Sequence, residues 1–469
     1  MSAVIQIHAQ ATGRLPLASG DPDRVLVFGG GAAPVRLGGF LAQAHALAAR
    51  LPEGRHMVPL VEDRHRFLLA FCAAALRGQS LLLPPSGAPG TVAEILRTHA
   101  AAGAYGLGGT PLEPPARHVP LPDLGQAAPC NGVPQVEAAA LAAIGYTSGS
   151  TGRPQAHAKT WAAFATGTAQ NRLALADLWG DAQPQIVATV PPQHMYGMEL
   201  SVLLPLLGGA AVHAGRPLLP ADVARALGEA RGPRLLVTTP VHLSALLRSG
   251  VALPPLAGLV SATAPLSPEL AAQAEARYGG QVREMFGSTE TCVFACRRTA
   301  LESLWRPMPG VRLWPQPDGT QVQAPHLPAP VALADLVEMH EDGRFRLCGR
   351  QADLLEIAGK RASLGDLTRR LLAVSGVEDG VVVQLDAERD GDVGRIAALA
   401  VAPGLSAADI VAALRGSVDP VFLPRRMRLL PALPRNATGK LRRDALLDLL
   451  NDAPAPHSSS IADGGGGAA

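Results

Sequence analysis

Residues 141–155 read LAAIGYTSGSTGRPQ, an apolar run followed at once by small and hydroxyl-bearing residues. The apolar part has the length and character of a buried strand. Residues 148–152 are all Gly, Ser or Thr. Glycine lets a backbone approach an anion closely, while hydroxyl and amide N–H groups can surround phosphate oxygens. The stretch therefore predicts a phosphate-binding loop at the end of a strand, with a flexible surface turn as the alternative.

The loop does not follow the Walker pattern, because no Gly-Lys-Ser/Thr sequence closes it. The pair Gly439-Lys440 fails the same pattern, since Leu441 follows it and Pro434 stands where the first glycine is needed. Another glycine run, VFGGGAAP at residues 27–34, has no hydroxyl groups and predicts a hairpin turn.

Three more apolar runs end in small or hydroxyl residues: QIVATVPPQH at 185–194, RLLVTTP at 234–240 and LAGLVSATAPL at 256–266. Together with residues 141–149, each is expected to form a doubly buried parallel strand. Open α/β sheets place their ligands at the carboxyl ends of such strands. Residues 221–230 and 267–278 have helical spacing between them. This alternation predicts a large α/β body.

The texture of the chain changes near Gly349. Residues 342–367 suggest strand, turn, strand and then an amphipathic helix, and residues 441–450, LRRDALLDLL, close a further compact unit with a helical pattern. The fold class predicted is thus α/β, with a large N-terminal domain of mixed or parallel sheets and flanking helices, and a small α+β C-terminal domain. The expected domains span residues 1–349 and 350–452, and residues 453–469, which lack apolar content, are expected to be a disordered tail.

Composition limits the class of partner. The chain has 469 residues, 48% of them hydrophobic and 17% charged, with a formal net charge of +2 and no block of basic residues. Neither nucleic acid nor an anionic membrane is an expected partner. No secretory signal is recognised at residues 1–16, and the most apolar segment, residues 200–215, is shorter than the ~20 residues of a spanning helix, so it predicts buried core. An odd count of five cysteines favours reduced thiols in a cytoplasm.

The phosphate-loop stretch YTSGSTGRPQ resembles that of the acyl-adenylate-forming superfamily, which includes acyl-CoA synthetases, aryl-acid ligases, peptide-synthetase adenylation domains and luciferases. Four further segments follow in that family's order: HMYG at 194–197, FGSTE at 286–290, ADLVEMHEDGRFRLCGR at 334–350 and LPRNATGK at 433–440. The resemblance covers nearly the whole chain except the tail. It implies activation of a carboxylic acid by ATP and Mg²⁺ to an acyl adenylate, followed by transfer to a thiol.

The resemblance also implies roles for individual nucleotide-binding residues. Phe286 would lie against adenine, Thr289 would contact the α-phosphate, and Glu290 would bind Mg²⁺, because a carboxylate beside polyphosphate needs a cation between them. The alternative for Glu290 is a solvated surface residue after a turn. The residues that would hold the β- and γ-phosphates are Thr147, Ser148, Gly149, Ser150, Thr151 and Gly152.

Three more positions match the family's nucleotide contacts and its adenylation residue. Asp335 would accept hydrogen bonds from both ribose hydroxyls, although an isolated aspartate there could also be a turn or cap residue. Arg350 would reach ribose or phosphate with its fixed positive charge. Lys440 would place an ammonium group between the carboxylate and the α-phosphate in the transition state, with an ordinary exposed lysine as the alternative.

The family uses a rotating small domain to serve two reactions, and the resemblance implies a hinge within residues 350–353. One pose presents Lys440 to ATP, and the other presents Gly359, Lys360 and Arg361 to the thiol. The chain departs from the pattern at two positions. Ala352 occupies the usual position of the hinge aspartate, and Asp353 follows it. Gln155 replaces the phosphate-loop lysine, for which His157 or Lys159 could substitute.

The acyl pocket implied by the resemblance has His194 as a gate beside the carboxylate, with a satisfied core histidine as the alternative. Tyr196 stands where relatives that activate amino acids carry an aspartate, which disfavours an α-amino acid. A flat apolar slot suits an aryl acid such as a hydroxybenzoate, although the methionines could equally be plain core. The expected pocket residues are Met195, Tyr196, Met198, Ser261 and Thr263, with Phe286 beside them.

The thiol acceptor would be the phosphopantetheine of an acyl carrier protein or free coenzyme A. The PQAHAKTW variant after the loop resembles stand-alone ligases of aryl-polyene and xanthomonadin-type pigment pathways, which favours the carrier protein. A basic rim could meet an acidic carrier helix, although such charges are usually solvated; it comprises Arg369, Arg370, Arg425 and Arg426. A competing class is a non-catalytic nucleotide-binding or regulatory protein with the same fold.

Overall fold

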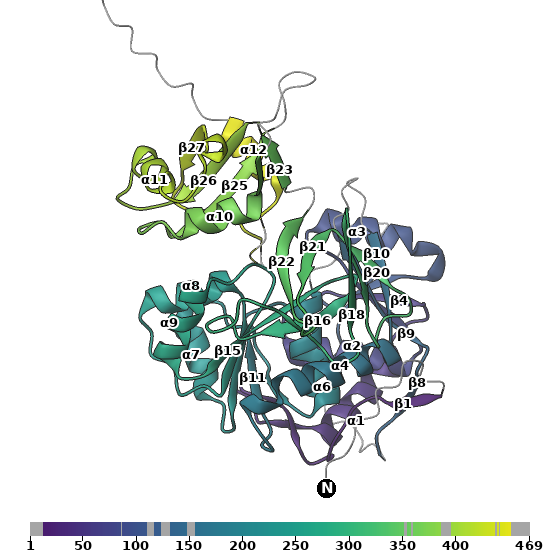
Figure 1. Ribbon diagram of the computed structural model, residues 1–469. Helices are drawn as coiled ribbons and strands as arrows, with labels where there is room; N and C mark the ends of the chain where they lie inside the picture. Colours follow the sequence, from purple (N-terminus) through teal and green to yellow (C-terminus); the bar gives the residue numbers. More distant parts are fainter. Residues whose placement is uncertain are drawn as a thin grey trace, which may run out of the picture. The chain divides into compact units, whose positions relative to one another are not determined.

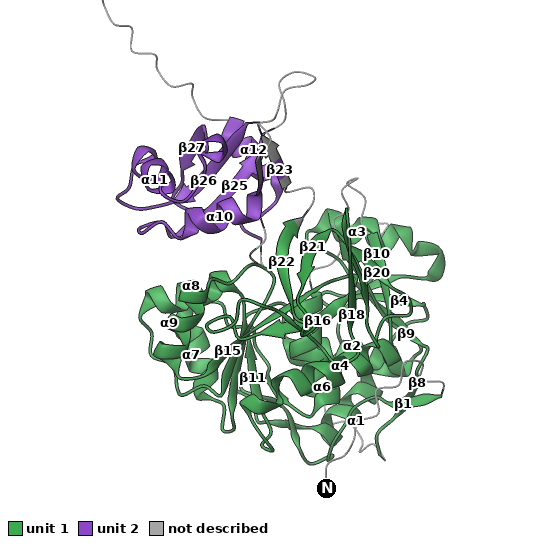
Figure 2. Ribbon diagram, in the orientation of Figure 1, with its two compact units in different colours: residues 1–351, 437–439 green, residues 352–436, 440–469 purple. Residues whose placement is uncertain are grey.

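The structure is a computed structural model that describes residues 13–85, 87–109, 117–122, 132–147, 155–350, 354–357, 360–385, 395–436, 439 and 441–451. The chain divides into two compact units, one of residues 1–351 with 437–439 and the other of residues 352–436 with 440–469 (Figure 2). Within the described ranges, no helix has the length and apolar character needed to cross a membrane. The predicted disordered tail lies outside the described residues.

A nine-stranded sheet forms the centre of the first unit, in the order β17-β16-β15-β14-β13-β11-β12-β2-β3. Its parallel part runs from β15 to β2, and β3, β16 and β17 add antiparallel strands at the two edges. The strands are β2 (Val25–Phe28), β3 (Val35–Arg36), β11 (Gln185–Ala188), β12 (Ala211–His213), β13 (Arg234–Thr238), β14 (Gly258–Ser261), β15 (Gln281–Ser288), β16 (Cys292–Arg297) and β17 (Arg306–Pro307). The three predicted parallel strands β11, β13 and β14 are confirmed and lie next to one another.

A six-stranded sheet has the order β10-β9-β5-β4-β6-β7. The strands are β4 (His56–Pro59), β5 (Ser80–Leu83), β6 (Tyr105–Leu107), β7 (His118–Val119), β9 (Leu141–Thr147) and β10 (Gln155–Thr160). The prediction for β9 was partly wrong. It is parallel to β5 but antiparallel to β10, because residues 148–154 are too few for the crossover that a parallel neighbour requires.

Helices fill the space around these sheets (Figure 1). Residues from both sheets pack with α1 (Leu37–Ala48), α2 (Arg64–Leu76) and α4 (Trp161–Leu175) in one buried core. On the other face of the nine-stranded sheet lie α7 (Pro220–Gly228), α8 (Pro240–Ser249) and α9 (Pro268–Tyr278). Each begins with a proline. Proline suits the first turn of a helix, because the main-chain N–H that it lacks would have no partner within the helix at that position. α3 (Pro89–Thr98) covers the outer face of the six-stranded sheet.

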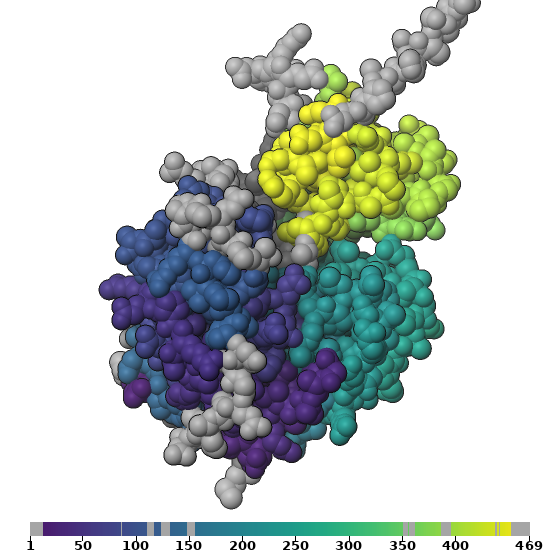
Figure 3. Space-filling view, turned by 180° about the vertical axis from the view of Figure 1, so that it is seen from behind, coloured from purple at the N-terminus to yellow at the C-terminus, as the bar shows by residue number. Residues whose placement is uncertain are grey.

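Smaller elements complete the first unit. The predicted core segment 200–215 is confirmed: a π-helix at Glu199–Leu203, α6 (Leu204–Gly208) and β12 bury most of its apolar side chains. β18 (Arg312–Gln316), β19 (Gly319–Gln323) and β20 (Val331–Leu333) form a sheet beside the hairpin of β21 (Asp335–Met339) and β22 (Phe345–Arg350). Short pieces are β1 (Arg14–Pro16) paired with β8 (Gln135–Glu137), α5 (Met195–Met198), and 3₁₀ turns at Ala100–Ala102 and Ala176–Leu178. Seen from behind, purple and blue N-terminal residues form one side of this unit and the teal segment the other (Figure 3).

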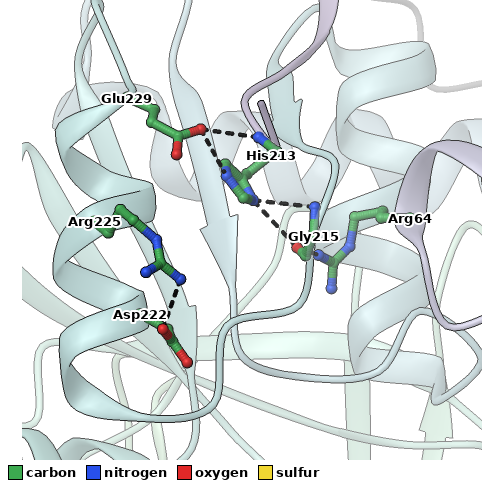
Figure 4. Close-up of polar contacts among 7 residues, drawn as sticks. Arg64, His213, Gly215, Asp222, Arg225 and Glu229 are labelled. Carbon is green, nitrogen blue, oxygen red and sulfur yellow. Dashed lines mark hydrogen bonds and ion pairs between the residues drawn. The ribbon is translucent and has the colours of Figure 1, made fainter. Parts of the chain in front are cut away.

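The glycine run at residues 29–31 makes the predicted hairpin turn between β2 and β3. All three glycines have φ between 73° and 79°, a conformation that favours glycine. The turn is held by Glu229, which accepts a hydrogen bond from the Gly30 amide at 2.9 Å and lies 3.2 Å from His213 Nε2 (Figure 4). A Cβ atom on Gly29 would lie 2.3 Å from the His213 ring. The run is therefore a structural turn.

The second unit is a small α+β fold, as expected. Its sheet has β25 (Asp379–Gln384) antiparallel to β26 (Ile396–Val401), which is parallel to β27 (Arg426–Leu429). Apolar residues of α10 (Leu364–Leu372) and α11 (Ala407–Leu414) pack in one core cluster, and those of α12 (Arg443–Asn451) pack in another with alternate residues of the same strands. The hairpin of β23 (Leu354–Ile357) and β24 (Lys360–Ser363) precedes α10, and a 3₁₀ turn spans Pro420–Phe422.

Candidate active site

The strands β9 and β10 flank the predicted phosphate loop. Residues 148–154, which include five of its six proposed phosphate contacts, lie outside the described residues. Thr147 ends β9 and pairs with Gln155, the first residue of β10. The Thr147 hydroxyl oxygen lies 3.1 Å from His157 Nε2. The residues on either side of the predicted loop therefore belong to one antiparallel ladder, and the imidazole of His157 lies beside Thr147, the residue before the loop.

His157 also reaches the predicted metal residue. Its Nε2 atom lies 3.4 Å from Glu290 Oε1. Burial would raise the pKa of Glu290, but the Ser288 hydroxyl, the backbone and the neighbouring His157 and Lys159 together hold it below its ordinary value. Burial lowers the pKa of His157, and the Glu290 carboxylate opposes that effect. His157 thus contacts both Thr147, at the start of the predicted phosphate loop, and Glu290, the predicted Mg²⁺ ligand.

The departure at Gln155 raised two candidate substitutes, and the structure separates them. Lys159 is buried, and its ammonium donates a hydrogen bond to the Glu290 main-chain carbonyl at 2.6 Å. His157 lies beside Thr147 and the Glu290 carboxylate. Of the two side chains, His157 is the one that lies beside Thr147, where the predicted loop begins. Lys159 instead contacts the main chain of the turn at residues 289–291, which joins β15 to β16.

Thr289 sits on a glycine of β9. A Cβ atom added to Gly145 would lie 2.8 Å from Thr289 Cγ2 and 3.0 Å from Met195 Cε. Such a short approach exists only because the position has no side chain. Gly145 therefore allows Thr289 of the FGSTE segment and Met195 of the HMYG segment to pack directly against β9, the strand that precedes the predicted phosphate loop.

Phe286 belongs to an aromatic cluster at the end of β15. Its ring centroid lies 5.1 Å from that of Phe294, 5.2 Å from Trp305 and 6.2 Å from Phe345. Phe345 is on β22, so the cluster ties the FGSTE segment to the β21–β22 hairpin. The rings give Phe286 a rigid platform.

Asp335 begins β21 and stands opposite Arg350 in the antiparallel ladder. The Thr320 hydroxyl donates to the Asp335 carbonyl at 2.6 Å and fixes the start of the strand. Residues directly opposite each other in such a ladder share one face. The two predicted ribose or phosphate contacts are therefore neighbouring positions on one hairpin.

The predicted acyl pocket joins α5 to the end of β14. His194 immediately precedes α5, and Met195, Tyr196 and Met198 are all buried. The Tyr196 hydroxyl donates to the Val260 carbonyl at 2.8 Å. Burial raises the pKa of Tyr196 well above its ordinary value. The Tyr196 hydroxyl proton is therefore used in a hydrogen bond to the main chain.

Ser261 and Thr263 follow the same strand end. Ser261 is fully buried, and its hydroxyl oxygen has no hydrogen-bond partner among the described residues. Thr263 has a left-handed backbone conformation with φ of 80°, an uncommon state for a β-branched residue that often marks functional sites.

Several predicted site residues cannot be placed from side chains. Lys440, Asp353, Gly359 and residues 148–152 lie outside the described residues, and only the main chain is described for Arg350 and Arg361. In the part of the chain that the structure covers, no group of three or more His, Cys, Asp or Glu residues could hold a metal ion.

Sequence reasoning missed a set of buried polar residues behind Glu290. They are Gln170, Asn171, Glu199 and His326. Their signal in the sequence is weak, because each is a single polar residue with no repeated spacing or motif.

Comparison with known proteins identifies the family. The AMP-binding enzyme family matches residues 64–335, a range that contains the predicted phosphate loop, Glu290 and Asp335. The chain belongs to the AMP-binding enzyme family.

Two curated relatives are aryl-acid enzymes by name. A 4-coumarate–CoA ligase of Halorhodospira halophila is 30% identical over 322 residues, covering 63% of this chain and 74% of the relative. A 3-hydroxybenzoate–CoA/4-hydroxybenzoate–CoA ligase of Thauera aromatica is 26% identical over 350 residues, covering 65% of each.

The solved structures support the fold. The o-succinylbenzoate CoA synthetase of Bacillus subtilis, in complex with its acyl-adenylate intermediate, superimposes with a TM-score of 0.78 at 18% identity, covering 92% of this chain and 98% of that one. ATP-bound MatB of Rhodopseudomonas palustris has a TM-score of 0.74 at 19% identity, covering 92% of this chain and 97% of that one.

Proposed function

We propose that this protein activates a carboxylic acid with ATP to give an acyl adenylate and then transfers the acyl group to a thiol. The observation that carries the proposal is the meeting of Thr147, His157 and Glu290 at the end of β9, with Thr289 seated on Gly145 of the same strand. An aromatic platform at Phe286 and the hairpin of Asp335 supply the remaining nucleotide contacts. Residues 1–349 would bind ATP and the acid, and residues 350–452 would act as the mobile lid that carries Lys440.

Magnesium fits the residues at this site. Glu290 offers hard oxygen donors, its lowered pKa keeps it ionised at neutral pH, and one or two carboxylates plus substrate phosphates are the usual ligands of Mg²⁺ in ATP-using enzymes. The ion would neutralise charge on the β- and γ-phosphates. The protein's own part is to hold the polyphosphate along residues 147–152, the α-phosphate at Thr289, and the adenine against Phe286.

Lys440 would act in the adenylation step. The attacking carboxylate and the α-phosphate are both anionic, so their approach concentrates negative charge at one centre. An ammonium placed there stabilises the transition state more than the separated reactants. A loop that brings Lys440 only for this step leaves the site open for the thiol afterwards.

An aryl acid, such as a hydroxybenzoate, is the proposed substrate class. The buried side chains of Met195, Tyr196 and Met198 give α5 an apolar character, and the Tyr196 hydroxyl is held by the main chain. A planar ring could stack on such a surface. The names of the coumarate and hydroxybenzoate relatives point to the same class.

The proposed thiol acceptor is the phosphopantetheine of an acyl carrier protein, as in the pigment-pathway ligases that the loop variant resembles. Arg369 and Arg425 on the second unit are exposed, which suits an acidic partner. Free coenzyme A is the second candidate, because the named relatives use it. Asp366 pairs with both Arg369 and Arg370 and reduces the positive charge available to a carrier protein.

ATP–pyrophosphate exchange over a panel of aryl and aliphatic acids tests the activation step. We expect exchange with one or more aryl acids. Intact-mass analysis with a holo carrier protein and with coenzyme A then identifies the acceptor. ATP binding without exchange for any acid would instead support the non-catalytic nucleotide-binding class.

A further inference from the structure

Buried side chains hold the main chain that directly follows the proposed Mg²⁺ ligand. Lys159 of β10 donates from Nζ to the Glu290 carbonyl at 2.6 Å. His326 lies with Nε2 2.6 Å from the Thr291 carbonyl oxygen. The two contacts come from residues 131 and 35 positions away in the chain, so tertiary packing and not local sequence creates them.

A third contact follows two residues later. The Val293 amide donates to both carboxylate oxygens of Glu199, at 3.1 Å each. We call Lys159, Glu199 and His326 the turn clamp. Their side chains are nearly inaccessible, with residues exposed by only 5%, 3% and 4%.

Consecutive residues of α4 support two members of the turn clamp. Asn171 donates to Glu199 at 3.2 Å. Gln170 lies 2.6 Å from His326 Nδ1 and donates to the Pro309 carbonyl at 2.9 Å. Since residues of α4 belong to the main core cluster, the clamp connects the turn to that core.

The held segment contains an unfavourable backbone conformation. Cys292, between the second and third contacts, has φ of 56°. Non-glycine residues in this region cost of order 1–3 kcal/mol and persist where the surroundings impose them. Here the turn clamp supplies those surroundings, on both sides of Cys292.

The turn clamp satisfies main-chain groups with side chains that are costly to bury. Burying the Lys159 ammonium costs several kcal/mol, and its hydrogen bond within the described residues goes to a main-chain carbonyl and not to a carboxylate. Thr291 and Val293 are buried, so their main-chain groups need protein partners instead of water. The contacts of the turn clamp lie at Glu290, Thr291 and Val293, directly at and after the predicted nucleotide-binding residues Thr289 and Glu290.

We infer that Lys159, Glu199 and His326 are positioning residues that hold the turn in the conformation that binds Mg²⁺-ATP. The inference rests on the proposed function, because it gives the turn its nucleotide-binding role. Lys159 acts through the Glu290 main chain, His326 through Thr291 and Glu199 through Val293. Lys159 thus does not restore the phosphate-facing charge that is absent at Gln155. Its ammonium instead holds the main-chain carbonyl of Glu290.

Lys159→Met in the full chain tests the inference. We expect Mg²⁺-ATP binding, measured by isothermal titration without any acid, to weaken about tenfold or more, as is usual when a residue behind a metal ligand is removed. The Mg²⁺ concentration for half-maximal pyrophosphate exchange should rise in parallel, while the KM for the acid stays within twofold. His326→Phe, which keeps a ring but removes the Thr291 contact, should change the same quantities and serves if Lys159→Met does not fold.

Arg64→Met is the matched control. Arg64 is also buried and also donates to main-chain carbonyls, those of Gly215 and Val190, neither of which belongs to the segment at residues 289–293. Its replacement should lower thermal stability without moving the Mg²⁺ half-saturation. A folded Lys159→Met protein with unchanged Mg²⁺-ATP affinity would overturn the inference. Wild-type protein that binds Mg²⁺-ATP but exchanges pyrophosphate with no acid would instead overturn the proposed function, and absence of binding would reject both.

Discussion

At the scale of single residues, Glu290 combines an ionised carboxylate with a main-chain carbonyl held by Lys159. Glu290→Gln keeps the shape of the side chain but removes the negative charge that Mg²⁺ needs. We expect pyrophosphate exchange to fall about 100-fold, with a raised Mg²⁺ half-saturation. Glu302→Gln, at an ion pair with Arg306 elsewhere in the unit, is the control and should leave both quantities unchanged.

Glu199 is the other carboxylate with a testable charge state. Burial raises its pKa to about 7, against smaller opposing effects of the Val293 amide, Asn171 and Lys159. The folded state therefore favours the protonated acid. Its contribution to stability is fully present below the unfolded pKa near 4.5 and is lost as the pH rises through 7.

Glu199→Gln should remove this dependence. Between pH 5 and 8 the free energy of unfolding of the wild type should fall relative to the variant by up to about 3 kcal/mol, from about 1.4 kcal/mol per unit of pKa shift. Urea unfolding of both proteins at four pH values measures the difference, and contributions of other groups cancel. A constant difference across that range would contradict the assignment.

At the scale of elements, β9 is the strand against which Thr289 and Met195 pack at Gly145. Gly145→Ala would place a methyl group 2.8 Å from Thr289 Cγ2, and the resulting overpacking costs about 1–3 kcal/mol. Because a shift of the FGSTE segment misaligns reacting groups, we expect kcat/KM to fall at least about tenfold. The measurement is steady-state exchange kinetics with ATP and acid varied in turn.

Two further variants make this test specific. Gly39→Ala adds the same methyl in α1, where nothing lies within 4 Å of the new atom, and should not reduce activity. Adding Thr289→Ser to Gly145→Ala removes the crowded Cγ2 and keeps the hydroxyl, so part of the activity should return. Failure of that rescue would show that the glycine serves another purpose.

At the scale of the whole molecule, two compact units carry different proposed duties. Lys440→Ala should nearly abolish adenylate formation, because the proposed role of the ammonium is to stabilise charge at the α-phosphate, while transfer from a supplied adenylate to the thiol should continue. Arg361→Ala should give the reverse pattern. Single-turnover measurements of each half-reaction distinguish them, and an equal loss in both half-reactions for Lys440→Ala would refute the division of labour.

The fold class was predictable because its signals are local. Runs such as residues 234–238 are apolar on both faces and end in hydroxyl residues, which is sufficient to recognise parallel strands and the edge at which they deliver polar groups. The antiparallel partner of β9 was missed, since an apolar run by itself does not state the direction of its neighbour. The loop length after it did contain that information.

The sequence by itself determined the family, the α/β body with its small α+β companion, and the segments that carry the proposed chemistry. Only the tertiary structure decided that His157 lies between Thr147 and Glu290, that Lys159 binds a main-chain carbonyl, and that Glu199 and His326 hold the same turn. The reason is physical. Strand and loop character follows from neighbouring residues, whereas these contacts join residues as many as 131 positions apart and exist only after the elements have packed.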